Sequence, residues 1–322
     1  MKVALDVSPL RQTRAGTARY VQALLTHAPV DYDRLAWGEG GRVAAAARDV
    51  LWYPWLLPMK ATGSDVLHCP TFRAPFRSRV PLVVTVHDLA VLRHPETFNR
   101  WTRTYSRVAV PRVAGAAARV IAVSEFTRRE TVELLAIPEE RVAVIANGVE
   151  TVFRPDGPSA EGEYVLAVGT LEPRKNLARA AEAAGRLGLE LRVAGERGWG
   201  GVRLPRGVHT VGFVGDGELA RLYRGALCLV YPSLYEGFGI PVLEAMACGT
   251  PVVTSRGGAT EETAGGAAVV VDPLDVASIA AGIEDALARR DELRAAGLAR
   301  ARAFDWPTCA RKTADVYRDL AA

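Results

Sequence analysis

The chain has 322 residues, of which 49% are hydrophobic and 24% are charged, and its formal net charge is +4. This composition excludes a disordered or collagen-like chain, and the 4 cysteines are too far apart to predict a zinc site or a disulfide framework. The length predicts two domains of about 150 residues each.

Short apolar runs alternate with stretches rich in Ala, Leu and Arg along the whole chain. In chain order, the predicted strands are residues 3–7, 66–68, 82–86, 120–123, 142–145, 164–168, 191–194, 210–211, 228–231, 251–254 and 268–271. Continuous apolar strands between helices indicate parallel sheets that are covered on both faces. We therefore predict an α/β protein of two Rossmann-like, doubly wound domains that face each other across a cleft.

Turn-forming residues between 147 and 163 break the periodicity and mark the expected boundary. We predict a first domain over residues 1–155 and a second over 156–304. A helix over about 305–322 ends the chain, and we expect it to pack back on the first domain.

Positive charge is concentrated in the first half. Residues 1–155 contain 21 Lys and Arg against 14 Asp and Glu, and many of the arginines lie between positions 73 and 112. An anionic membrane or a phosphorylated acceptor would be attracted to such a surface, although a solvated arginine-rich face gives the same pattern. No nucleic-acid-binding motif accompanies the charge, so we expect no nucleic-acid partner.

The sequence predicts neither a membrane-spanning segment nor a signal peptide. Charged residues interrupt every long apolar stretch, and the apolar run at the N-terminus stops at Asp6, as in a strand rather than a signal peptide. We expect a cytoplasmic location, with peripheral contact at the inner face of the cell membrane.

Polar and glycine-rich clusters follow several predicted strands at their carboxyl ends, where open α/β sheets bind ligands. In the first half these clusters are His87-Asp88, Ser124-Glu125 and Asn147-Gly148. In the second half they are Gly169-Thr170, Arg174-Lys175-Asn176 and residues 233–239. The pattern predicts a ligand site that is built from both halves.

The stretch from Tyr231 to Pro251 is the richest in polar and glycine residues that suit a ligand site. Pro241 suits the first position of a helix over about 240–248, and Gly249 suits its end. Free N–H groups at the start of this helix would bind an anion. The carboxylates of Glu236 and Glu244 suit hydroxyl groups, so the cations for a phosphate come from the pair Arg174-Lys175.

Each of these residues also has an ordinary structural explanation. Glu244 would complement the helix dipole, and Arg174-Lys175 would lie at the start of a helix capped by Asn176. His87 suits a buried histidine, Asp88 a cap or turn, and Gly16 a turn before a helix over 18–28.

Several other motifs are absent. Gly237-x-Gly239 lacks the third glycine of a dinucleotide fingerprint, and no Walker A or His-Glu-x-x-His sequence occurs. Asp31-Tyr32-Asp33 matches an Asp-x-Asp metal motif, but it follows Pro29 and predicts a loop. We therefore expect no cofactor and no metal.

Taken together, these motifs resemble glycosyltransferase family 4, whose members are retaining enzymes of the GT-B fold. The resemblance extends over the whole chain. Its most specific elements are Glu236-Gly-Phe-Gly-Ile-Pro-Val-Leu-Glu244, the family's E-x7-E motif, and Gly169-Thr-Leu-Glu-Pro-Arg174-Lys175-Asn176.

The resemblance implies a role for each matching position. Arg174 and Lys175 would bind the diphosphate of the donor and stabilise it as it leaves, and Glu236 would lie beside the donor hexose. The other donor-binding positions implied are Gly16, Gly169, Val214, Phe238, Gly239, Ile240 and Glu244. Of these, Glu244 would bind the ribose, and the backbone around Val214 would hold the nucleotide base. His87 would lie near the transferred sugar, and Asp88 and Ser124 on the acceptor side.

These assignments predict a glycosyltransferase that moves a hexose from GDP-mannose or a UDP-hexose to an acceptor hydroxyl of a glycan, glycolipid or small glycoside. Preorganised cations and helix N–H groups would stabilise the leaving diphosphate without a metal. By analogy, the leaving group departs on the front face and its phosphate oxygen accepts the acceptor's proton. The alternatives are a GT-B nucleotide-sugar epimerase and a non-catalytic nucleotide-binding partner subunit.

Overall fold

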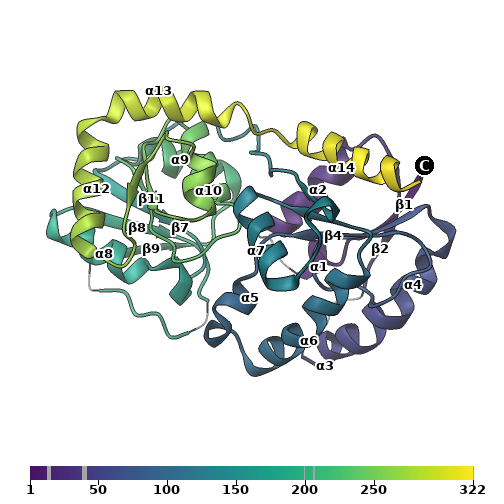
Figure 1. Ribbon diagram of the computed structural model, residues 1–322. Helices are drawn as coiled ribbons and strands as arrows, with labels where there is room; N and C mark the ends of the chain where they lie inside the picture. The colour runs from purple at the N-terminus through teal and green to yellow at the C-terminus, as the bar shows by residue number, and fades with distance from the viewer. Residues whose placement is uncertain (13–15, 38–41, 199, 206, 322) are drawn as a thin grey trace. The chain divides into compact units, whose positions relative to one another are not determined.

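The computed structural model describes residues 1–12, 16–37, 42–198, 200–205 and 207–321 (Figure 1). Its contacts divide the chain into two compact units. The first comprises Met1–Gly148 and Trp306–Ala322, and the second comprises Val149–Asp305. The chain thus enters the second unit at 148/149 rather than at the predicted 155/156. The terminal helix belongs to the first unit.

The strands of the described residues form two six-stranded sheets in which every pairing is parallel. The first sheet has the order β2-β1-β3-β4-β5-β6 and the second the order β12-β11-β10-β7-β8-β9. The strands are β1 Lys2–Asp6, β2 Asp31–Leu35, β3 Val66–Cys69, β4 Leu82–Val86, β5 Arg119–Ala122, β6 Val142–Val144, β7 Tyr164–Val168, β8 Glu190–Ala194, β9 His209–Gly212, β10 Leu229–Tyr231, β11 Val252–Ser255 and β12 Val269–Val271.

Helices connect these strands. They are α1 Pro9–Gln12, α2 Gly16–His27, α3 Arg42–Ala47, α4 Leu57–Lys60, α5 Ala90–Arg93, α6 Arg100–Ala116, α7 Glu125–Leu135, α8 Leu177–Arg186, α9 Asp216–Gly225, α10 Ile240–Ala247, α11 Ala259–Ala264, α12 Val276–Ala288, α13 Arg290–Ala301 and α14 Trp306–Ala321. A π-helical stretch, η1 (Arg48–Leu56), precedes α4, and a 3₁₀ turn, η5 (Pro173–Lys175), precedes α8.

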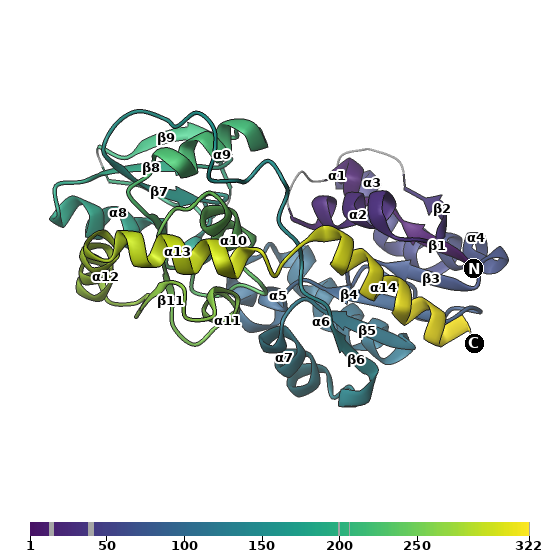
Figure 2. The ribbon, with the colours of Figure 1, turned by 90° about the horizontal axis from the view of Figure 1, so that it is seen from above.

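The first sheet is covered on both faces, which explains why its central strands are apolar along their whole length. On one face α2 and α14 pack against alternate residues of β1 and β4, such as Val3 and Val83. On the other face η1, α4 and α6 pack against residues such as Ala4 and Val84. Figure 2 shows α14 lying along this unit, where it contacts α2.

A buried polar network joins α14 to the first sheet. The ring of His68 in β3 is hydrogen-bonded on both sides, by Nδ1 to the Tyr317 hydroxyl at 2.6 Å and by Nε2 to the Thr85 hydroxyl at 2.8 Å. Tyr20 of α2 also bonds Thr85, at 3.0 Å. Burial lowers the pKa of His68 to about 3, so the ring is neutral at pH 7 and serves as a structural link.

The second sheet is built in the same way. Helices α8 and α12 cover one face and α9 and α10 cover the other, so that neighbouring residues of β7 such as Val165 and Leu166 belong to opposite cores. The chain runs outward from β7 to β8 and β9, then returns to place β10 on the other side of β7. The topological switch point of this sheet therefore lies between β7 and β10.

The structure corrects one of the predicted elements. Asp31-Tyr32-Asp33 was predicted to be a loop, but it forms the start of β2 and pairs in register with Lys2-Val3-Ala4. Because β2 is an edge strand, its side chains are half-buried or exposed and do not form an apolar run.

Candidate functional site

The candidate site of the second unit lies at the switch point of its sheet. The loop that follows β7 leads into η5, which carries Arg174 and Lys175, and the loop that follows β10 carries Glu236. After β7 the chain continues to one side of the sheet, and after β10 it continues to the other side. The carboxyl ends of two such adjacent strands leave a crevice between their loops, and ligands of open parallel sheets bind there. A backbone hydrogen bond of 2.8 Å from Leu234 N–H to the Arg174 carbonyl joins the two loops.

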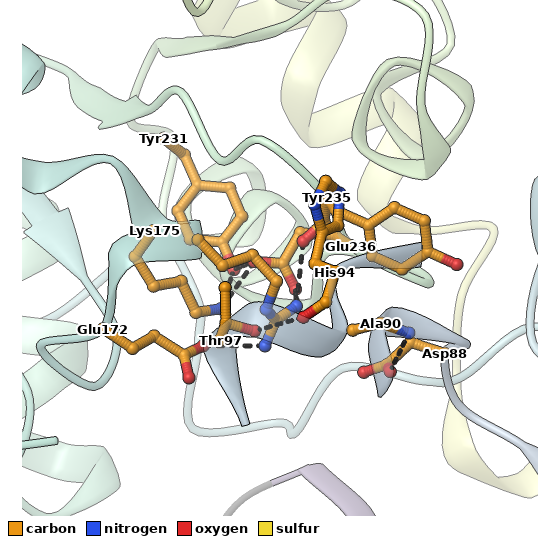
Figure 3. Close-up of polar contacts among 10 residues, drawn as sticks. Asp88, Ala90, His94, Thr97, Glu172, Lys175, Tyr231, Tyr235 and Glu236 are labelled. Atoms are coloured by element: carbon orange, nitrogen blue, oxygen red, sulfur yellow. Dashed lines mark hydrogen bonds and ion pairs between the residues drawn. The ribbon is translucent and has the colours of Figure 1, made fainter. Parts of the chain in front are cut away.

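Lys175 and Glu236 form the central pair of this site (Figure 3). The Lys175 ammonium donates to Glu236 Oε1 at 2.6 Å and to the Tyr231 hydroxyl at 2.8 Å. Tyr231 also donates to Glu236 Oε1, at 3.0 Å. The side chains of Lys175 and Glu236 are only 13% and 11% exposed, so this pair is largely shielded from water.

Arg174 lies between two carboxylates. Its guanidinium donates to Glu236 Oε2 at 3.1 Å, to Glu172 Oε1 at 2.7 Å and to the Tyr235 carbonyl at 2.8 Å. Glu172 is buried, and it precedes Arg174 by two residues in the same turn. Both cations of the predicted phosphate site are therefore held in place by carboxylates of the same unit.

The pair is ionised at neutral pH. Burial alone would raise the pKa of Glu236, but Lys175 and Arg174 lower it to about 2. Burial alone would lower the pKa of Lys175, but Glu236 and Tyr231 outweigh burial and raise it. A fixed, protonated ammonium and guanidinium stabilise negative charge that develops beside them, because no solvent has to reorganise.

Helix α10 begins directly beyond this loop. Gly239 is the residue before its first turn and has a φ of +101°, which a residue with a side chain rarely adopts. Pro241 is the second residue of the helix, one position after the predicted first position. The carbonyl of Phe238 accepts a hydrogen bond of 2.7 Å from Thr263 of α11, which holds the loop against the neighbouring helix.

Glu244 lies one turn into α10 and is buried. The Tyr223 hydroxyl of α9 donates to its Oε2 at 2.9 Å. The side chain is therefore oriented by a specific partner. Val214 lies in the loop between β9 and α9, where it packs partly buried against the same core.

Gly169, the first residue after β7, shows why this loop needs glycine. It has a φ of +141°, and a Cβ there would lie 3.1 Å from the Lys175 side chain. Gly195, after β8, allows an even closer approach, since a Cβ would lie 2.0 Å from the Gly169 carbonyl oxygen. The backbone of the Arg174-Lys175 loop thus rests directly on the next loop of the sheet.

The remaining predicted residues belong to the first unit. His87 follows β4, and its Nε2 is buried with no hydrogen-bond partner among the described residues. Burial lowers the pKa of His87 to about 4, so its ring is neutral at pH 7. Asp88 accepts from Ala90 N–H at 2.9 Å, and Ser124 caps α7 by accepting from Thr127 N–H. Gly16 is the first residue of α2.

The structure thus brings Arg174, Lys175 and Glu236 into direct contact and places Glu244 one turn into the following helix. The predicted meeting of these residues with His87, Asp88, Ser124 and Gly16 stays a prediction. Sequence reasoning missed three partners of the site: Glu172, Tyr223 and Tyr231. The position of Glu172, two residues before Arg174, could have indicated it from the sequence. Nothing in the sequence indicates that the two tyrosines contact the site.

Two further observations concern ions and membranes. Within the described ranges, no group of three or more His, Cys, Asp or Glu side chains is arranged to hold a metal ion. The described helices include none that is long and apolar enough to cross a bilayer.

Comparison with known structures places the fold in the GT-B class, a two-domain Rossmann-like architecture. The sucrose-phosphate synthase of Thermosynechococcus elongatus matches with a TM-score of 0.78 at 20% identity, and 99% of each chain is covered. Anabaena Alr3699/HepE, solved in complex with UDP and glucose, matches with a TM-score of 0.75 at 19% identity over 99% of each chain.

Sequence comparison gives the family. Residues 149–303 match the family described as "Glycosyl transferases group 1", and residues 38–153 match "Glycosyltransferase Family 4". The O-antigen chain mannosyltransferase B of Escherichia coli is 34% identical over 284 residues, which cover 79% of this chain and 74% of that protein. The MMP alpha-(1->4)-mannosyltransferase of Mycolicibacterium hassiacum is 31% identical over 277 residues, covering 75% and 66%. The chain belongs to glycosyltransferase family 4 and is a glycosyltransferase, which confirms the predicted family, fold class and enzyme class.

Proposed function

We propose that the chain is a retaining glycosyltransferase that transfers a hexose from a nucleotide diphosphate sugar to an acceptor hydroxyl. The observation that carries this proposal is the largely shielded cluster of Lys175, Arg174 and Glu236 at the switch point of the second sheet. Its two cations suit a diphosphate, and its carboxylate suits the hydroxyls of a sugar.

In this proposal the second unit binds the donor. Arg174 and Lys175 stabilise the negative charge of the departing diphosphate, and the backbone N–H groups of Phe238, Gly239 and Ile240 add to this stabilisation. Glu244, oriented by Tyr223, accepts hydrogen bonds from the ribose hydroxyls. The proton of the acceptor hydroxyl passes to the phosphate oxygen on the same face, so that the product keeps the configuration of the donor.

We further propose mannose as the transferred sugar, with GDP-mannose as the first donor to test and a UDP-hexose as the second. Two relatives that are 34% and 31% identical carry the name mannosyltransferase, which supports this choice. A thermal-shift panel of GDP, UDP, GDP-mannose and UDP-glucose would identify the donor by the largest rise in Tm. The anomeric configuration of the product, read by NMR, then tests the mechanism, because an inverted product would refute retention.

A surface of the first unit supports a second proposal, that the protein docks on anionic membranes. Trp55 of η1 and Met59 of α4 are 67% and 65% exposed, although neighbouring residues of both helices are buried in the core. The same core includes residues of α6, whose Trp101 is 50% exposed and donates its indole N–H to Asp49 of η1. Exposed arginines of α6 are Arg100, Arg103, Arg107 and Arg112, and its sequence contains no acidic residue.

Exposed tryptophan beside arginine is the combination that binds at a lipid headgroup layer. The protein is expected to sediment with vesicles that contain phosphatidylglycerol and to stay in solution with phosphatidylcholine alone. Arg103→Gln and Arg107→Gln should each weaken this binding about fivefold. Arg186→Gln, an exposed helical arginine of the second unit, is the matched control and should change nothing. Equal binding to both kinds of vesicle would exclude the proposal.

A further inference from the structure

Asn176 has an unusual backbone between the two segments that it joins. It lies between η5 and α8 with φ +57° and ψ +29°, in the left-handed region that asparagine tolerates better than most residues. The sequence predicts that its side chain caps α8. In the structure this side chain makes no capping hydrogen bond, although it is 5% exposed. A buried amide that does not cap its own helix has other partners.

Those partners are in loops that follow other strands of the sheet. Nδ2 donates to the Pro232 carbonyl at 3.0 Å, directly after β10, and to the Pro273 carbonyl at 2.6 Å, after β12. Oδ1 accepts from Arg179 at 2.9 Å. An asparagine amide has two N–H donors, and both are used to hold loops beyond its own. One side chain thus links the loop after β7 to the loops after β10 and β12.

This link lies immediately beside the Lys175–Glu236 pair. Asn176 follows Lys175 in the chain, and Pro232 precedes Glu236 by four residues. The backbone bond from Leu234 to Arg174 lies between them. The Asn176 amide and this backbone bond are therefore two neighbouring connections between the turn that carries the cations and the loop that carries the carboxylate.

We propose that Asn176 is a positioning residue, which holds the Arg174-Lys175 turn at a fixed distance from the Glu236 loop. This inference rests on the proposed function, in which the turn binds the donor diphosphate. Because catalysis by fixed charges depends on their placement, a small displacement of the turn lowers diphosphate binding and turnover together.

Two substitutions separate the amide from the backbone conformation. Asn176→Gly keeps the left-handed backbone without strain but removes the side chain. Asn176→Asp keeps the size of the side chain but has no N–H donor for the two carbonyls. Arg179→Ala is the matched control, because it removes the contact to Oδ1 and leaves both bonds from Nδ2.

The first readout is nucleotide binding measured by calorimetry. Wild-type protein is expected to bind the nucleoside diphosphate more tightly than the corresponding monophosphate. In Asn176→Gly and Asn176→Asp the advantage of the diphosphate should fall about tenfold, with kcat lowered by a similar factor. A merely structural role would lower Tm and leave both this ratio and the kcat per folded molecule unchanged.

The second readout does not depend on any ligand. The amide hydrogen of Leu234 is expected to exchange faster in both Asn176 variants, whereas the Leu166 amide in β7 keeps its wild-type rate. If wild-type protein shows no preference for the diphosphate, the proposed function fails. The exchange rate of the Leu234 amide still tests whether Asn176 holds the two loops together. If the preference exists and the Asn176→Gly protein retains it together with slow Leu234 exchange, the positioning role is overturned.

Discussion

Replacing Lys175 with alanine is expected to lower kcat/KM of glycosyl transfer by about 10²–10³-fold, equivalent to about 3–4 kcal/mol. The ammonium is protonated, largely shielded from water and fixed by Glu236 and Tyr231, so in the proposed function it is preorganised for the charge of the leaving diphosphate. Turnover with the donor found in the thermal-shift panel measures the effect.

The same substitution also leaves Glu236 with Arg174 as its cationic partner, and breaking a buried ion pair destabilises a protein by about 3–5 kcal/mol. The double variant Lys175→Met/Glu236→Gln separates the two effects, since it removes both charges of the Lys175–Glu236 pair. We expect it to regain stability in urea denaturation relative to Lys175→Ala while remaining inactive. Lys312→Ala, at an exposed lysine of α14, is the matched control and should keep full activity. A fully active Lys175→Ala protein would contradict the assigned role.

The Gly195→Ala protein is expected to be less stable than wild type by at least about 3 kcal/mol and to lose activity in the molecules that still fold. The added Cβ would lie 2.0 Å from the Gly169 carbonyl oxygen and 2.5 Å from its carbonyl carbon, so the backbone itself must move. The Gly169 N–H donates a hydrogen bond of 2.9 Å to the carbonyl of Ala194, the last residue of β8. Any movement there displaces the loop that leads to Lys175.

Urea denaturation and kcat/KM of the soluble fraction measure the two effects of this substitution separately. Gly185→Ala is the matched control, because Gly185 lies in α8 with no atom within 4 Å of an added Cβ. It is expected to stabilise the protein by about 0.5–1 kcal/mol, as alanine favours a helix over glycine. A Gly195→Ala protein with wild-type stability would show that the two loops are not in contact in solution.

The fold could be predicted from the sequence where strands are buried on both faces. Residues 82–86 and 164–168 were predicted as strands and form β4 and β7 with the same bounds. The prediction was wrong at β2, because this edge strand carries the polar sequence Asp31-Tyr32-Asp33, which is also typical of a loop. A run of apolar residues indicates that a segment is buried, so it identifies the buried strands and does not identify an edge strand.

The candidate site could be predicted where its residues form a motif along the chain. Arg174, Lys175 and Glu236 were identified from their positions after two predicted strands, and the structure shows them in contact. Their partner Tyr231 was not identified, because a tyrosine at the end of a buried strand reads as part of the core. Asn176 was expected to cap α8 with its side chain, but its amide bonds Pro232 and Pro273 instead.

The amino-acid sequence by itself determined the two-domain α/β class, the family and the ionisable groups of the candidate site, because each of these depends on local periodicity or on residues close together in the chain. Only the tertiary structure decided which strands flank the switch point, how Glu236 and Glu172 share the charge of Arg174, and where the Asn176 amide is bound. These features depend on contacts between loops up to 97 residues apart. Such contacts exist only after the sheet has brought the carboxyl ends of its strands to one edge, and no local pattern specifies them in advance.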